Sequence, residues 1–264
     1  MSQPRPPVIT ALVWAYWDSY YAVRTNWRLA LSATAILAIG AVGALIIPKL
    51  LSSDPIRQEV VRLPLLIGMC FLLTPFLLAV PRYVLLGEQA SRYDLNASSP
   101  RFQLLFGWLS VSALIVSIPS VLTAIAAPTG PVTYLGERPA EFGNATTILV
   151  ANVIAFFVMQ RLLLLFPAIA VDAPGATWQN AFADIRGHLW FSLAVTILPF
   201  IPLKLLGIAV AALLRPFSGT PVVLIVAALW LGVLLLAALT LTSVIAARLY
   251  QVSGDRLNAV VPDA

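Results

Sequence analysis

Charged residues are scarce in this chain, and their scarcity excludes an ordinary water-soluble domain. Only 10% of the 264 residues are charged, whereas 60% are hydrophobic. Soluble chains average about 25% charged and about 45–50% apolar residues. A soluble domain so poor in charge would expose large apolar patches and aggregate. The composition therefore indicates an integral membrane protein that crosses the bilayer several times.

Cysteine and histidine each occur once. A single cysteine excludes a disulfide within the chain, and Cys70 lies in an apolar run where a small packing residue is expected. His188 has no second histidine with which to share a metal ion. We therefore expect no metal site and no cofactor.

Catalytic signatures are also missing. The chain contains no Gly-x-Ser-x-Gly, no His-Glu-x-x-His and no P-loop. The closest approach to a glycine-rich motif is Gly40-Ala-Val-Gly43, which is typical of small residues that let two helices pack closely. We therefore expect a protein that is not an enzyme.

The net charge of +5 and the pI near 9.7 do not indicate a nucleic-acid partner. The basic residues are scattered between apolar runs and form no patch. Arginines beside membrane spans are explained by topology and by contact with anionic lipid head groups. Membrane lipids are thus the expected partners, together with other membrane proteins or further copies of the chain.

The pattern predicts an all-α, polytopic transmembrane helical bundle that forms one membrane domain over 1–264. A helical span needs about 20 mostly apolar residues. Six runs satisfy this, at 29–47, 63–86, 104–127, 146–171, 189–214 and 222–247. The first 26 residues lack the apolar core and cleavage site of a signal peptide, so we expect the first span to act as an uncleaved anchor.

Prolines make two of the spans irregular. Pro75 and Pro81 lie in the second run, which we expect to end or kink near them. The fifth run contains Pro199, Pro202 and Lys204. Two alternatives fit that run: a continuous helix whose lysine reaches the nearer interface, or a broken helix.

The basic residues near the span ends predict the orientation. If the N-terminus is cytoplasmic, nine of them lie on that side and five on the other, with Arg161 and Lys204 counted as intramembrane. Cytoplasmic loops carry the excess of Lys and Arg. The count favours both termini in the cytoplasm and three hairpins that rise from that side.

Two amphipathic segments precede odd-numbered spans. Residues 8–26 and 176–187 each place aromatic and aliphatic side chains on one helical face and end with an arginine, Arg24 or Arg186. Both patterns are typical of helices that lie in the cytoplasmic interface with the aromatic face in the lipid. The alternative is that these faces pack on the protein.

Arg161 is the most unusual charge, because it lies inside the apolar run 146–171. A charge at mid-bilayer costs roughly 2.5–3.5 kcal/mol on insertion scales unless it is paired or reaches water. If the helix continues to Asp172, Arg161 lies about 16 Å from that end, near mid-membrane. If Pro167 breaks the helix, Arg161 lies nearer the interface.

The candidate polar cluster comprises the charges that could meet at this end of the spans. Glu88 is the first candidate to pair with Arg161, and Asp184 the second. One interpretation is a site that binds an anion such as a lipid phosphate. The other is a structural ion pair or an arginine that reaches the interface. The members of the cluster are Arg82, Glu88, Arg161, Asp172, Asp184 and Arg186.

Two stretches carry a family resemblance. One is Arg82-Tyr-Val-Leu-Leu-Gly-Glu88, followed by Arg92 and Arg101, and the other runs from Arg161 through Pro167, Asp172 and Trp178 to Trp190. They resemble six-span alphaproteobacterial inner-membrane proteins, which are similar to YciC-like proteins and to the membrane domain attached to some glycerophosphodiester phosphodiesterases. Gly187-His188 stands where a Gly-Asn is common in that pattern. The resemblance implies a helical bundle in a bacterial inner membrane and no reaction.

Together these observations favour a non-enzymatic membrane protein that acts through lipid or protein partners, for example in envelope maintenance or assembly. A transporter or permease of small solutes or lipids, with Arg161 in its pathway, is the alternative. A transporter requires a polar cavity beside Arg161, whereas a partner protein does not. A membrane enzyme acting on lipids has the least support.

Overall fold

Ten α-helices and one 3-10 turn account for most of the residues that the structure describes. The structure is a computed structural model, and it describes residues 7–90, 92–126, 139–186, 189–217 and 221–258. The elements are α1 (Val8–Thr25), α2 (Trp27–Leu51), α3 (Pro55–Leu86), α4 (Pro100–Ala126), α5 (Pro139–Leu162), α6 (Leu165–Ala170), α7 (Trp178–Ile185), α8 (Leu189–Ile197), α9 (Phe200–Leu214), η1 (Arg215–Phe217) and α10 (Pro221–Ser253).

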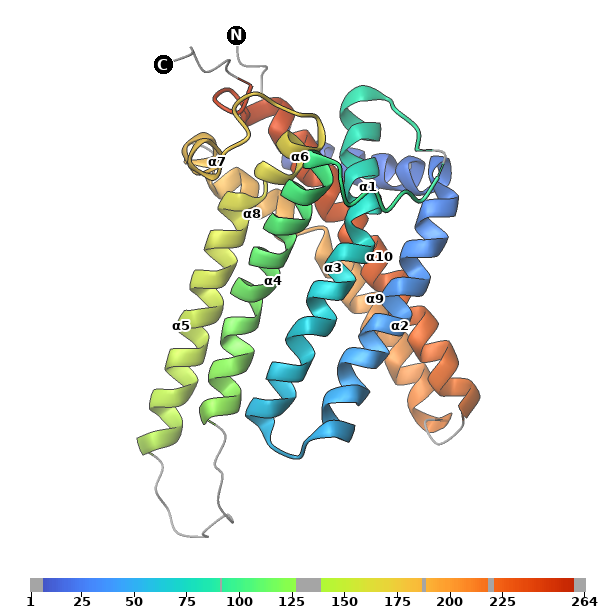
Figure 1. The fold of residues 1–264 in the computed structure, drawn as a ribbon, viewed down its shortest axis with the longest axis vertical. Helices are drawn as coiled ribbons and strands as arrows, with labels where there is room; N and C mark the ends of the chain where they lie inside the picture. The colour runs from blue at the N-terminus through green and yellow to red at the C-terminus, as the bar shows by residue number, and fades with distance from the viewer. Residues whose placement is uncertain (1–6, 91, 127–138, 187–188, 218–220, 259–264) are drawn as a thin grey trace.

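Six helical runs among these elements are long and apolar enough to cross a membrane, as the sequence predicted. They are Trp27–Leu51, Pro55–Leu86, Pro100–Ile125, Thr146–Ala170, Leu189–Leu214 and Val222–Ser253. The spans stand side by side, and α1 and the last turns of α10 lie at the same end of the bundle (Figure 1). We call this the termini end.

The second span is one continuous helix despite its prolines. Pro75 and Pro81 lie inside α3, which ends only at Leu86. Gly87 then adopts a left-handed conformation with φ 70°, which is open to glycine without strain. The expected end of this span near its prolines is therefore wrong, and α3 lies at the centre of the bundle, packed against α2, α4 and α10.

The fourth span is not the single helix that the sequence predicted. Pro167 has no N–H group to donate to the carbonyl of Leu163, and its ring crowds that carbonyl. The helix accordingly ends at Leu162, turns through Leu163 and Leu164, and resumes as α6. Every residue of α6 is buried except Phe166, which is half-buried.

The fifth span is also broken, which decides between the two alternatives for it. The break falls at Leu198 and Pro199, between α8 and α9, where both Pro199 and Pro202 lack an N–H donor. The hydroxyl of Tyr16 donates to the carbonyl of Pro199 at 2.5 Å and so ties α1 to this break. Lys204 lies exposed on α9, whose residues are all exposed or half-buried.

Helix α1 lies across the termini end, nearly perpendicular to the spans (Figure 1). Its packed face is made of small residues, since Ala15 and Ala22 are its buried side chains. The aromatic face points away from the bundle: Trp17 is 56% exposed and Tyr20 54% exposed. Most of the aromatic face of this helix therefore does not pack on the protein, although Tyr16 contacts Pro199.

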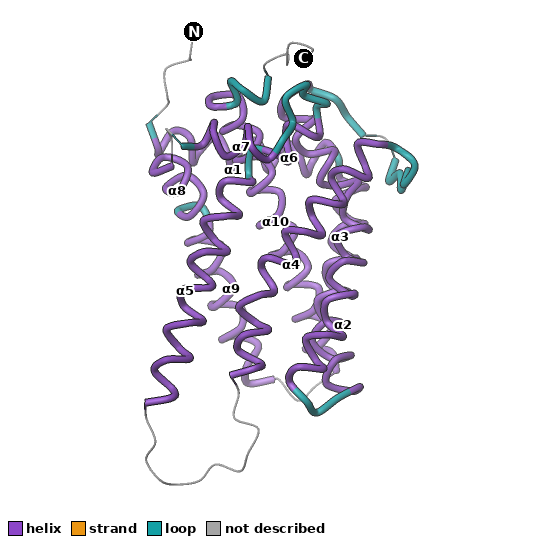
Figure 2. The backbone as a smooth tube through the Cα atoms, turned by 60° about the vertical axis from the view of Figure 1, so that its left-hand side comes forward, coloured by secondary structure: helices purple, strands orange, loops and turns teal. Residues whose placement is uncertain are grey.

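The second interfacial segment behaves differently. Helix α7 also lies across the termini end (Figure 2). Its Ala181 and Ile185 are buried while Trp178 is 46% exposed. The predicted apolar face of α7 is thus divided between the protein and the surroundings. Its N-terminus is capped by Thr177, whose hydroxyl accepts from the backbone N–H of Asn180.

The segment after α10 is clamped against the residues around α7. The backbone N–H of Gly175 donates to the carbonyl of Leu257 at 3.0 Å. The carboxylate of Asp184 accepts from the backbone N–H groups of Arg256 and Leu257 at 3.1–3.2 Å. Burial raises the pKa of the Asp184 carboxyl, and the N–H groups of Leu257 and Arg256 oppose that shift. These contacts join segments more than 70 residues apart.

We predict that Gly175→Ala lowers the thermal unfolding midpoint in detergent. A Cβ atom at Gly175 would lie 2.9 Å from the Leu257 carbonyl oxygen and closer still to that of Arg256, both of them backbone atoms. Overpacking of this kind destabilises by about 1–3 kcal/mol.

The matched control is Gly107→Ala on α4, where a Cβ atom would meet nothing within 4 Å. Alanine is the better helix former there, so this change is expected to leave the unfolding midpoint unchanged or raise it slightly. Equal midpoints for the two variants would contradict the clamp.

Candidate functional site

The end of α3 folds back on itself through an ion pair. Because Gly87 turns the chain in the left-handed conformation, Glu88 returns toward Arg82 on the last turns of the helix. The Arg82 Nε donates to Glu88 Oε2 at 2.8 Å, and its Nη2 contacts the same oxygen. Both side chains are partly exposed. Glu88 is therefore paired with Arg82 and not with Arg161, which corrects the first expected partner.

Arg82 also satisfies the end of α6. Its Nη1 donates to the carbonyl of Ala170 at 2.9 Å. The last carbonyls of a helix have no partner within that helix, and a basic side chain is a favourable one. One guanidinium thus joins the loop after α3 to the C-terminus of α6.

Asp172 terminates the fourth span. It is the one residue other than glycine with a positive φ among the described residues, at 53°. The N–H of Ala173 bonds the carbonyl of Ala168 at 2.9 Å, which is the hydrogen bond of a Schellman turn. Aspartate tolerates this conformation better than most residues with a side chain, although glycine is usual there.

The Asp172 carboxylate faces the start of α4. It accepts from Arg101 Nε at 2.7 Å and also contacts Nη2, which makes a two-point pair. Arg101 follows Pro100, the first residue of α4. A positive charge at a helix N-terminus opposes the helix dipole, and the carboxylate of Asp172 compensates it.

These two pairs form one arginine–carboxylate network, made of Arg82, Glu88, Arg101 and Asp172. Arg101 is close enough to Arg82 and Glu88 to interact electrostatically with both. The four formal charges sum to zero, so the network offers an incoming anion no uncompensated cation. The network's evident role is structural, because its contacts join α3, α4 and α6 at the termini end.

Arg161 stands outside this network. The break before Pro167 leaves it one residue from the C-terminus of α5, toward the termini end. Its guanidinium lies over the ring of Phe182 on α7, 5.5 Å from the centroid. No carboxylate of the described part of the chain forms a salt bridge with it. The face of the Phe182 ring on α7, and not Glu88 or Asp184, is its partner.

The other predicted members of the polar cluster also lie apart from the arginine–carboxylate network. Asp184 holds the segment after α10 through backbone N–H groups, as described above. Arg186 is exposed and takes part in none of the salt bridges formed within the described ranges. His188 lies outside the described residues. The predicted cluster of six is thus one network containing three of them, with the other three apart from it.

Two long-range contacts of this end escaped the sequence reasoning. One is the role of Arg101, which was noted only as part of the family pattern. The other is the pair between Arg248 Nε on α10 and Asp18 Oδ2 on α1, at 2.7 Å. The available signal was that Arg101, Asp172 and Arg248 flank predicted spans, and Asp18 lies in a predicted interfacial helix, all at the same predicted side. Which arginine meets which acid depends on how the helices pack.

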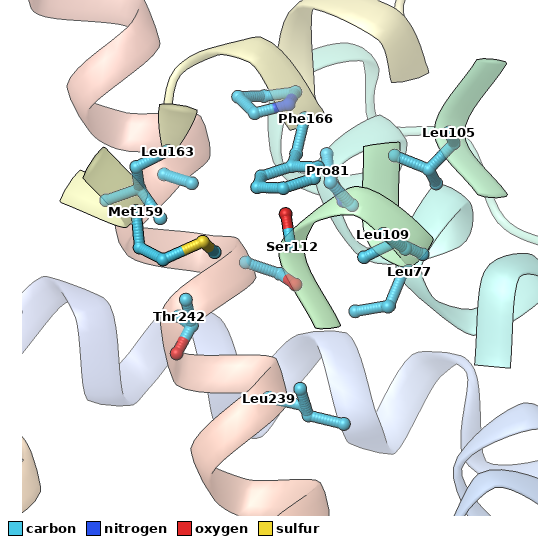
Figure 3. A pocket seen from close by; sticks show the side chains of 13 residues that line it. Leu77, Pro81, Leu105, Leu109, Ser112, Met159, Leu163, Phe166, Leu239 and Thr242 are labelled. Atoms are coloured by element: carbon cyan, nitrogen blue, oxygen red, sulfur yellow. The ribbon is translucent and has the colours of Figure 1, made fainter. Parts of the chain in front are cut away.

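A cavity of about 160 Å³ lies deeper between the spans. Helices α3, α4, α5, α6 and α10 contribute its walls, and the side chains that line it are almost all apolar (Figure 3). None of the six predicted cluster residues lines it. No group of three or more metal-ligating side chains occurs within the described ranges.

Comparison with known proteins finds no matching family model, no similar curated protein and no similar solved structure. The resemblance to YciC-like proteins and to phosphodiesterase membrane domains therefore stays a prediction.

We predict that the stability of Asp172 variants depends more on the backbone conformation at this position than on the loss of the charge. Asp172→Ala should destabilise most, by about 1–3 kcal/mol, because alanine is strained at positive φ and loses the pair with Arg101. Asp172→Gly and Asp172→Asn should each cost less than about 1 kcal/mol. The readout is the thermal unfolding midpoint in detergent, with Arg101→Gln as the second arm. An alanine variant as stable as the wild type would contradict this reading of the turn.

A double-mutant cycle separates the two possible partners of Arg161. Arg161→Leu and Phe182→Leu should couple by about 0.5–2 kcal/mol in unfolding free energy, the range of a cation–π contact. Arg161→Leu and Glu88→Gln should be additive within about 0.5 kcal/mol, because those residues share no contact. Glu88→Gln and Arg82→Gln serve as the positive control. Coupling of Arg161 to Glu88 instead of Phe182 would refute the arrangement.

Proposed function

We propose that this chain is a non-enzymatic integral protein of a bacterial inner membrane that acts through anionic lipid head groups at its termini end. In this proposal the termini end faces the cytoplasm. The observation that carries the proposal is the outward aromatic face of α1 together with the unpaired arginines beside it. Work in envelope maintenance or assembly, with protein partners or further copies of the chain, is part of the same proposal.

The aromatic face suits the membrane interface. Tryptophan and tyrosine concentrate at the depth of the head groups, where a ring can lie in the acyl boundary and its polar atom in water. Trp14, Trp17, Tyr20 and Tyr21 are all 46–56% exposed on α1. Trp17 and Tyr21 are stacked with ring centroids 5.9 Å apart, so the face presents a continuous aromatic surface. An exposed surface of this kind needs lipid around it.

Arginines follow this face at the junction of α1 and α2. Arg24 and Arg28 are exposed and take part in no salt bridge within the described ranges. The Arg28 guanidinium lies 5.4 Å from the centroid of Trp27. A polar hollow of about 350 Å³ at this junction is lined by Thr25, Asn26, Trp27, Arg28, Gln89 and Ala90. Each such basic group contributes about 1 kcal/mol toward an anionic lipid surface.

The transporter alternative finds less support. A pathway through Arg161 needs a polar cavity beside it, and the cavity between the spans is apolar and not lined by Arg161. Arg161 instead contacts α7 through the Phe182 ring. The prediction that the chain is not an enzyme remains a prediction, because it rests on the sequence motifs alone.

Native mass spectrometry of the detergent-solubilised protein tests this proposal. Arg28→Gln should weaken retention of phosphatidylglycerol about fivefold, the equivalent of about 1 kcal/mol, and leave phosphatidylcholine retention unchanged. Arg57→Gln is the matched control, because Arg57 is exposed at the opposite end of the bundle and already paired with Asp54 at 3.6 Å. Equal loss of both lipids in Arg28→Gln, or equal effects of the two substitutions, would count against head-group recognition at the termini end.

A further inference from the structure

Among the side chains that line the cavity between the spans, Ser112 has a fully buried polar atom without a hydrogen-bond partner, whereas Ser243 is only half-buried. Ser112 on α4 is 6% exposed, and its Oγ is buried with no hydrogen-bond partner. In Figure 3 the hydroxyl points into the space enclosed by Met159, Leu109 and Phe166. An unpaired buried hydroxyl is energetically unfavourable, so its orientation requires an explanation.

Neighbouring hydroxyls on the same helix behave otherwise. Ser110 donates to the carbonyl of Phe106 at 2.9 Å, and Ser117 donates to that of Ala113 at 2.7 Å. Both use the carbonyl four residues back, which is the usual solution for serine in a membrane helix. Ser112 does not use it and keeps its donor for the cavity.

The residues that line the cavity differ in burial. Met159 on α5 and Leu239 and Thr242 on α10 are only half-buried, whereas Leu105 on the inner wall is fully buried. The principal packing partners of α5 are α4 and α7, and α10 is not among them. Ser112 lies 12 residues into α4, about 18 Å along the helix and thus near the middle of a hydrocarbon layer about 30 Å thick.

The lining limits what can bind. No charged side chain lines the cavity, so an ionic ligand would be left uncompensated. A volume of about 160 Å³ would admit several waters, each of which needs two to four polar partners. The lining has only three hydroxyls, on Ser112, Thr242 and Ser243, and that of Thr242 already donates to Ala238. A bare acyl chain would fill the space but leave Ser112 unpaired.

We propose that this cavity is a binding site for a neutral, membrane-soluble molecule with a ring-sized apolar body and one acceptor oxygen, which accepts from Ser112 Oγ. A dry protein cavity of about 150 Å³ is known to hold benzene, so the volume suits one six-membered ring. A ring ketone has the required chemistry. The site lies near mid-bilayer and does not depend on the head-group proposal for the termini end.

Photolabelling with two matched probes tests the site in phosphatidylcholine nanodiscs. One probe is a cyclohexanone that carries a diazirine on its ring, and the other is the cyclohexane analogue without the ketone. In the wild-type protein the ketone should saturate at a lower mole fraction in the bilayer. Its adducts, located by tandem mass spectrometry, should fall on cavity residues such as Leu109 and Met159.

Substitutions then separate the hydroxyl from the cavity. Ser112→Ala should raise the half-saturation of the ketone about two- to tenfold, the effect of losing one hydrogen bond, and leave the hydrocarbon unchanged. Ser110→Ala, two residues away with its hydroxyl already bonded to Phe106, should change neither. Ala246→Leu fills the cavity and should remove the adducts of both probes, and Thr242→Leu is the second filling variant if the first fails to fold.

Three results would overturn the proposal. Equal half-saturation of the two probes in the wild-type protein would mean that Ser112 binds no acceptor. An unchanged ketone response in Ser112→Ala would assign the acceptor to another group. Adducts confined to lipid-facing positions of α9, such as Leu205, would mean that the probes label the protein surface and not the cavity.

Discussion

The missing N–H group of Pro167 determines how the fourth span meets the rest of the bundle. Without it the Leu163 carbonyl loses its helical partner, so α5 ends at Leu162 and the chain turns before α6. The turn buries α6 between α3, α4 and α10. It also brings the carbonyl of Ala170 to Arg82 and the carboxylate of Asp172 to Arg101. Arg161, next to the end of α5, is left to contact α7. The charge pairing at the termini end therefore follows from one backbone interruption.

Long-range polar contacts make the termini end the cohesive half of the molecule. Asp18 joins α1 to α10, Tyr16 joins α1 to the break in the fifth span, and Asp184 holds the segment after α10. Each exposed ion pair contributes little alone, about 0–1 kcal/mol. Their effect comes from joining elements far apart in the sequence over a shared apolar core. The buried residues of α3 and α10 lie in the same half, at Leu73–Pro81 and Leu236–Tyr250.

The sequence was sufficient to predict the spans and insufficient to predict their partners. The thickness and apolarity of the lipid set the length and hydropathy that a span needs. Six helical spans could therefore be predicted from the sequence, and the structure confirms them. Proline did not predict the breaks consistently. The span that contains Pro167 is interrupted, whereas Pro75 and Pro81 lie inside one continuous helix, α3, which packs against α2, α4 and α10. The pairing of Glu88 with Arg82 depended on the left-handed turn at Gly87. The pairing of Arg101 with Asp172 joins residues 71 positions apart and required the fold itself.

The half of the bundle away from the termini end has the opposite character. In the most hydrophobic segment of the fifth span only 6% of the residues are buried, and α9 has no buried residue. Apolar helices gain little from packing on one another when lipid is equally apolar, so α9 has little reason to pack tightly on the bundle. The cavity that contains Ser112 lies between α3, α4, α5, α6 and α10. A ligand there would exchange contact with lipid for contact with the spans. The bilayer interior cannot supply a hydrogen bond, so in this proposal the selectivity of the site comes from the lining hydroxyls, of which that of Ser112 is fully buried and unbonded.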